Sequence, residues 1–77
     1  MALSPGQTMW IEGWDIARNE PSPRQVEIVR AAPGGATYKV RLQDGTEREI
    51  AEGELHRSRE IATARSLETR RRILGNP

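Results

Sequence analysis

Residues 38–50 read as two β-strands joined by a tight turn. Apolar side chains occupy every second position from Tyr38 to Leu42, which is the period of a strand with one buried face. Asp44-Gly45 then supplies a two-residue hairpin turn, because this pair favours the backbone twist that the flanking strands require. The return strand, Thr46 to Ile50, carries two glutamates on one face, so we expect it at a sheet edge, where charge discourages aggregation. A short chain with such a ribbon builds its core from antiparallel sheet.

Two more segments with strand character precede this hairpin. Thr8 to Trp14 alternates in the same way, and Gln25 to Ala31 is rich in β-branched residues and ends in the turn Pro33-Gly34-Gly35. Between them, ARNEPSPR at positions 17–24 contains two prolines, which exclude helix and central strand. We therefore predict a loop there.

A helix is predicted after the strands. Ser58 is a suitable N-cap, Glu60 lies in the first turn, and three arginines lie in a last turn that ends near Leu74. Its apolar stripe is narrow: Ala64, Leu67 and Leu74 share a face. Such a helix leans on the body or on a partner.

The composition limits both the core and the chemistry. With 77 residues the chain buries only about 60% of its unfolded surface, and just 35% of its residues are hydrophobic. There is no Cys, and His56 alone cannot build a zinc site; we expect this histidine to hydrogen-bond locally. Glu12 and Asp15 have no reactive partner in the sequence and are expected to be surface charges. We predict no enzyme, no cofactor and no metal.

No targeting or membrane segment is evident. The start, MALSPGQT, lacks the basic and apolar regions of a signal peptide, and no stretch approaches the roughly 20 apolar residues of a membrane span. A cytoplasmic protein is the expectation.

Charge is distributed unevenly along the chain. Through Leu55 there are six basic and nine acidic residues, a net charge of −3, whereas from His56 onward six arginines and two glutamates give +4. The sequence thus predicts an acidic body and a basic end.

The predicted order of elements resembles a known group of small barrels. The resemblance rests on Pro5-Gly6-Gln7 before the first strand, Val26 to Val29 in the second, Tyr38 to Gly45 in the third with its turn, and Glu54-Leu55 at the close. These residues are similar to the Tudor, KOW and Src-homology-3-like (SH3-like) group over about residues 5–56. The resemblance implies a non-enzymatic module that binds nucleic acid or a peptide. Binding of methylated Lys or Arg is not expected, because an aromatic cage needs about three or four rings and the chain has only Trp10, Trp14 and Tyr38.

The predicted fold is mainly β: a small SH3-like or Tudor-like antiparallel barrel, five-stranded and partly open, followed by one C-terminal helix. Residues 1–56 are assigned to the barrel, with Leu55 closing one end of its core. Residues 57–77 are assigned to the Arg-rich helix and tail.

The arginines of the C-terminal segment are the first candidate binding residues. Six guanidinium groups can neutralise several phosphates, and such binding weakens with salt. Two other readings stay open: a solvated helix with surface ion pairs to Glu68, and docking on an acidic protein face. The residues are Arg57, Arg59, Arg65, Arg70, Arg71 and Arg72.

The remaining candidates lie in the predicted barrel. Trp10 and Trp14 share one face of the first strand; either they are exposed and stack on bases or a partner, or at least one fills a core that contains no Phe. Tyr38 is expected in the core with its hydroxyl at the rim. Lys39 and Arg41 offer a polar outer face.

These observations predict a nucleic-acid-associated accessory module that uses its Arg-rich helix. The alternative is a protein adapter or assembly subunit whose helix docks on an acidic partner or on another copy of the chain. No membrane partner and no small-molecule substrate are evident.

Overall fold

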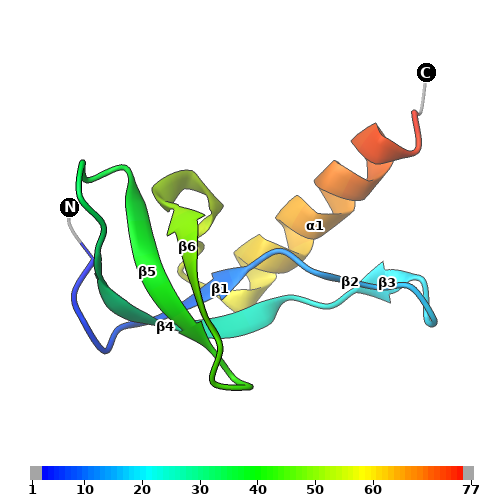
Figure 1. Ribbon diagram of the computed structural model, residues 1–77. Helices are drawn as coiled ribbons and strands as arrows, with labels where there is room; N and C mark the ends of the chain where they lie inside the picture. Colours follow the sequence, from blue (N-terminus) through cyan, green and yellow to red (C-terminus); the bar gives the residue numbers. More distant parts are fainter. Residues whose placement is uncertain (1–2, 76–77) are drawn as a thin grey trace.

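The computed structural model describes residues 3–75; residues 1–2 of the N-terminal segment and 76–77 of the predicted tail lie outside the described residues. Six strands precede one helix (Figure 1). In chain order the elements are β1 (Thr8–Ile11), β2 (Trp14–Asp15), β3 (Glu20–Pro21), β4 (Arg24–Ala31), β5 (Thr37–Leu42), β6 (Glu47–Ala51), the 3₁₀ turn η1 (Glu52–Glu54) and α1 (Arg59–Ile73).

The fold is mainly β with one C-terminal helix, as predicted, but the main sheet has four strands where five were predicted, and the described residues form no closed barrel. Four strands form an antiparallel sheet in the order β1-β4-β5-β6, and β2 and β3 form a separate two-stranded ribbon. In the part of the chain that the structure describes, β6 pairs with β5 and not with β1. Instead, the chain after η1 returns to β1 through one bridge, in which Trp10 and His56 exchange two backbone hydrogen bonds of 2.8 Å.

The predicted first strand, Thr8 to Trp14, ends at Ile11, and the prediction of a loop before β4 was wrong in part. The segment contains the short β2–β3 ribbon, in which Trp14 lies opposite Pro21. A ribbon of two strands tolerates proline because each strand has one unpaired edge. Asn19, with φ of 54°, makes the turn in the left-handed region that asparagine tolerates.

The predicted β5–β6 hairpin is present, but its turn is longer than expected. The amide of Gly45 donates to the carbonyl of Leu42 at 3.0 Å, and the amide of Leu42 donates to Thr46 at 2.8 Å, which leaves three residues in the loop. Gly45 has φ of 90° whereas Asp44 keeps a negative φ, so a two-residue turn with both residues at positive φ does not form. The Asp44 carboxylate accepts hydrogen bonds from the Thr46 hydroxyl and amide, which lower the pKa of Asp44.

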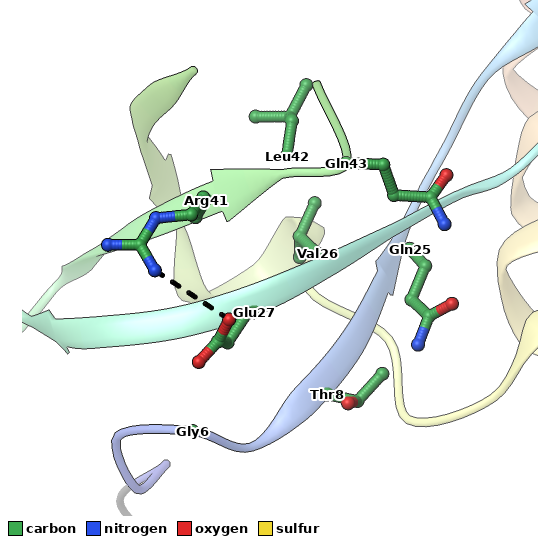
Figure 2. A pocket seen from close by; sticks show the side chains of 8 residues that line it. All are labelled: Gly6, Thr8, Gln25, Val26, Glu27, Arg41, Leu42 and Gln43. Atoms are coloured by element: carbon green, nitrogen blue, oxygen red, sulfur yellow. Dashed lines mark ion pairs between the residues drawn. The ribbon is translucent and has the colours of Figure 1, made fainter. Parts of the chain in front are cut away.

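Charges of opposite sign face each other on the outer side of this sheet. Glu27, Arg41 and Glu47 lie side by side on β4, β5 and β6. Arg41 lies 3.9 Å from Glu27, as the dashed line in Figure 2 shows, and 3.1 Å from Glu47. Cross-strand pairs of this kind support the register of a sheet whose outer face is solvated.

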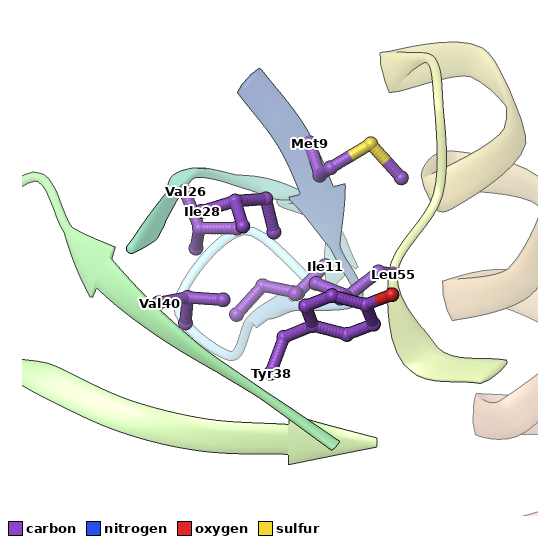
Figure 3. Close-up of a cluster of buried hydrophobic side chains, with 7 residues drawn as sticks. All are labelled: Met9, Ile11, Val26, Ile28, Tyr38, Val40 and Leu55. Atoms are coloured by element: carbon purple, nitrogen blue, oxygen red, sulfur yellow. The ribbon is translucent and has the colours of Figure 1, made fainter. Parts of the chain in front are cut away.

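The inner side of the sheet carries the core (Figure 3). Ile28 and Val40 are fully buried at its centre, and Tyr38 is buried, as predicted, with its hydroxyl accepting a hydrogen bond from the Leu3 amide at 3.2 Å. Leu55 packs against the same cluster, also as predicted, because η1 turns the chain back toward β1. The full cluster is Met9, Ile11, Val26, Ile28, Tyr38, Val40 and Leu55.

Helix α1 forms where it was predicted, but it packs through a different face. Ser58 accepts a hydrogen bond from the Ile61 amide at 3.2 Å as N-cap, and Gly75 follows the last turn with φ of 65°. The predicted stripe is exposed, with Leu67 39% accessible, whereas Ala62 and Ser66 are buried. Small side chains let the helix approach β1 closely, and the larger apolar residues point away.

Candidate functional site

The C-terminal helix is held against β1 and the β2–β3 ribbon by polar contacts. The buried hydroxyl of Ser66 accepts a hydrogen bond from the Gly13 amide at 3.2 Å and donates to the Ala62 carbonyl at 2.8 Å. One turn further along, the Arg70 guanidinium lies 5.0 Å from the centre of the Trp14 ring. Stacking of this kind orients the guanidinium plane and adds a favourable cation–π term.

This stack encloses two polar groups. Trp14 Nε1 and Arg70 Nε are buried and make no hydrogen bond among the described residues. The anchor therefore depends on ring contact and packing rather than on hydrogen bonds from these atoms.

Glu12 joins the sheet to the helix. One carboxylate oxygen accepts a 2.6 Å hydrogen bond from the Thr69 hydroxyl, and the other lies 3.8 Å from Nε2 of the buried His56, too far for a hydrogen bond. The expectation that Glu12 is a surface charge is thus incomplete, since the side chain is half-buried at a contact between two elements. The expectation of local hydrogen bonding by His56 is not met: its Nε2 is buried without a hydrogen-bond partner among the described residues, and its backbone pairs with the distant Trp10.

The six arginines of the candidate interface fall into three groups. Arg70 is half-buried over Trp14 and positions the last two turns of the helix. Arg65 and Arg72 lie 3.9 and 2.8 Å from Glu68 in ion pairs on the helix surface. The alternative of a solvated helix with surface ion pairs therefore accounts for these two residues. The rest are exposed and make no ion pair within residues 3–75: Arg57, Arg59 and Arg71.

The two candidate basic residues of β5 have acidic neighbours. Lys39 lies 3.2 Å from Glu47, and Arg41 contacts the same carboxylate. Hydrogen bonds from Lys39 and then from Arg41 lower the pKa of Glu47, so its negative charge is retained beside them. The structure does not bring Lys39 and Arg41 together with the arginines of α1, and we leave these two residues out of the proposed interface.

Neither tryptophan belongs to the core. Trp10 and Trp14 are both half-buried, and the buried cluster is completed by Met9 and Leu55 instead. The reading in which one of them replaces a missing phenylalanine is therefore wrong. Trp14 contacts the helix through Arg70, while Trp10 lies at the bridge to His56.

Sequence reasoning missed the residues that seat the helix. The recurrence of Ala62 and Ser66 at four-residue spacing is a usable signal, because small residues on one helical face allow close packing. Their counterparts on the sheet side, Glu12 and Gly13, carry no such signal, since their partners lie more than 50 positions away.

Two classes of site are not found in the described residues. Residues 3–75 contain no group of three or more His, Cys, Asp or Glu side chains placed to hold a metal ion. Over the same range, no helix has the length and apolar character needed to cross a membrane.

The chain was also compared with known proteins. No model of a protein family, no curated protein and no solved structure matches it.

Proposed function

We propose that this protein is a non-enzymatic binding module that contacts the phosphate backbone of nucleic acid through the C-terminal half of α1. The observation that carries the proposal is the position of the last helical turns. They extend beyond the four-stranded sheet (Figure 1), and the exposed Arg71 and Arg72 belong to the last turn of the helix. Arg70, held on Trp14, sets the direction in which this basic end points.

We also propose that the body is a partly open barrel of the Tudor, KOW and SH3-like kind. Support comes from the meander β4-β5-β6, the 3₁₀ turn after it, and the return of His56 to β1 through a two-hydrogen-bond bridge. In such a module the body is a rigid platform and recognition belongs to its periphery.

Phosphate contact needs charges that are free to leave their protein partners. Arg71 makes no ion pair among the described residues, and the bonds from Arg65 and Arg72 to Glu68 are exposed pairs, which contribute little to stability. Exchanging such a pair for a phosphate contact costs little. Arg65 and Arg72 are two turns apart, about 10 Å along the axis, so these residues can reach different phosphates.

Salt-dependent binding tests this proposal. Anisotropy of labelled duplex DNA and single-stranded RNA should show binding at low salt, with log K on duplex falling against log salt at a slope of about −3 for three phosphate contacts. The double variant Arg71→Ala/Arg72→Ala should reduce the magnitude of that slope by about 2. Arg70 is kept because it also seats the helix.

The matched control removes the same charge from the sheet. Arg24→Ala/Arg30→Ala deletes two exposed arginines of β4 and should leave the slope unchanged. Absence of binding to either nucleic acid at low salt contradicts the proposal, and equal slopes for the two double variants place the contact elsewhere.

A second candidate function is that of a protein adapter. The observation that favours it is the exposed side of α1, where Ile61 is 47% and Leu67 39% accessible beside the arginines. A mixed apolar and basic helix face suits docking on an acidic protein surface, including that of another copy. Light scattering across protein and salt concentrations separates the cases, because self-docking through charge increases the mass at low salt, whereas a monomer under all conditions excludes it.

A further inference from the structure

The free edge of β6 presents an ordered row of backbone groups. Among the described residues β6 pairs only with β5, in an antiparallel register bounded by the hydrogen bonds Leu42 N to Thr46 O and Glu52 N to Ala36 O. Because antiparallel pairs alternate between bonded and non-bonded positions, every second residue of β6 points its N–H and C=O away from β5. These outward residues are Glu47, Glu49 and Ala51; Ala51 offers only its N–H, because as the N-cap of η1 its carbonyl accepts the first hydrogen bond of that turn.

A groove runs beside this edge, at the point where the sheet stays open. It lies between β6 and the end of β1, with a volume of about 320 Å³. Ile11 and the half-buried Ile50 give it an apolar floor continuous with the core. Three carboxylates and one guanidinium complete its lining: Glu12, Glu49, Glu54 and Arg48.

Strand pairing between two copies of the chain does not fit this edge. In the antiparallel register that pairs all five residues of β6 with a second β6, Glu49 faces its own equivalent. A shift by two positions toward the hairpin turn places Glu47 opposite Glu49, whereas the opposite shift avoids this repulsion but pairs only three residues of each β6. Like charges directly opposite one another destabilise a pair of strands, so the edge discriminates against self-association.

The charges favour a basic occupant. Glu49 and Glu54 make no ion pair within residues 3–75, and they stand beside the apolar floor of the groove. In an extended segment where Lys or Arg alternates with apolar residues, the side chains point alternately to opposite faces. The basic side chains could then meet Glu49 and Glu54, and the apolar side chains could cover the floor of the groove. The arginines of α1 do not supply such a segment, because they lie in a helix.

We propose that the free edge of β6 binds an extended, basic peptide segment of another protein by strand addition. The outward backbone groups of β6 hold the peptide main chain, its apolar side chains cover the groove next to Ile11 and Ile50, and its basic side chains meet Glu49 and Glu54. This site is separate from the arginines of α1 and does not depend on nucleic-acid binding.

The test uses a labelled eight-residue peptide of alternating lysine and valine. It should bind the full chain, while a glutamate–valine peptide of equal length should not. Two further versions of the lysine–valine peptide carry backbone N-methyl groups, one on its odd and one on its even residues. Each keeps the charge of the parent peptide but loses the N–H donors along one edge of the extended chain. One of them should lose at least tenfold in affinity, because a strand offers only one edge to β6.

Variants and hydrogen exchange locate the contact on the protein. Glu49→Lys/Glu54→Lys should weaken binding at least tenfold, whereas Glu20→Lys/Glu60→Lys, an equal charge change at exposed positions away from β6, should stay within about twofold. On binding, the amides of Glu47, Glu49 and Ala51 should exchange more slowly.

Three results overturn the proposal. The first is absence of binding of the lysine–valine peptide at millimolar concentration. The second is equal affinity of both N-methylated peptides and the parent, which means charge attraction without strand pairing. The third is unchanged exchange at the three outward amides in the wild-type complex, a result that needs no variant to fold. None of these outcomes bears on binding of DNA or RNA by α1.

Discussion

Gly13 lies where the chain leaves β1 for the β2–β3 ribbon, and two other elements meet its backbone there. Its amide donates to Ser66 of the helix, and its carbonyl accepts a 2.9 Å hydrogen bond from the Ser22 amide. A Cβ at this position would collide with the carbonyl oxygen of Ser22. Glycine is required because two backbones approach closely, and no unusual φ is involved.

Gly13→Ala should therefore destabilise the protein by about 1–3 kcal/mol, the range for inserting a carbon into a packed site. Urea unfolding followed by circular dichroism measures the effect as a lower midpoint. Gly53→Ala is the matched control: Gly53 has open space around it, so the free energy of unfolding should change by no more than about 0.5 kcal/mol. Equal midpoints for the two variants would show that the contact with Ser22 yields without cost.

Among the elements, the β5–β6 hairpin depends most on charge. Lys39 and Arg41 of β5 both reach Glu47 of β6, and hydrogen bonds from these two residues lower the pKa of Glu47 from its ordinary value of 4.5. A carboxyl whose pKa is lowered in the folded state stabilises that state at pH values above its ordinary pKa. The stabilisation is lost as the pH falls through the lowered value.

Acidification should accordingly weaken wild-type protein more than a Glu47→Gln variant. The measurement is the urea midpoint of each protein at pH 7 and at pH 3. The midpoint should decrease less between these two pH values for Glu47→Gln than for the wild type. Glu49→Gln serves as the control, because its carboxylate makes no ion pair among the described residues, and it should retain most of the wild-type loss. If Glu47→Gln and Glu49→Gln lose equally, the cross-strand pairs do not act in solution.

In the whole molecule, the sheet and the basic helix are joined by a contact built from small residues. Ala62 is fully buried and Ser66 nearly so, while the helix extends past the sheet toward the C-terminus (Figure 1). The orientation of the proposed nucleic-acid interface therefore depends on a contact that has no room for larger side chains.

Ala62→Leu should force the helix away from β1 and destabilise the protein by about 1–3 kcal/mol. Hydrogen exchange should show faster exchange in α1 with the sheet amides less affected. Ala64→Leu makes the same chemical change on the exposed side of the helix and should alter stability by less than about 0.5 kcal/mol. Destabilisation by Ala64→Leu and not by Ala62→Leu would contradict the observed packing face.

Much of the fold follows from local patterns, and most of the candidate site does not. β-Branched residues predicted β4, the alternation of apolar residues predicted β5 with Tyr38 in the core, and Ser58 predicted the start of α1. Leu55 was predicted to close one end of the core, and it packs there. The same reasoning placed the arginines on one helix. It did not distinguish Arg70, which is stacked on Trp14, from Arg71, which is exposed, because the ring lies 56 positions away.

The amino-acid order alone set the positions of β4, β5, β6 and the helix and the separation of charge between body and end, since each depends on neighbours within a few positions. Three-dimensional packing decided which helix face is buried, which arginines are available and where the sheet stays open. The physical reason is that α1 carries apolar residues on several sides, so close approach by Ala62 and Ser66 outweighs the burial that Leu67 offers. Likewise, Glu47 neutralises Lys39 and Arg41 only because the strand register brings them together.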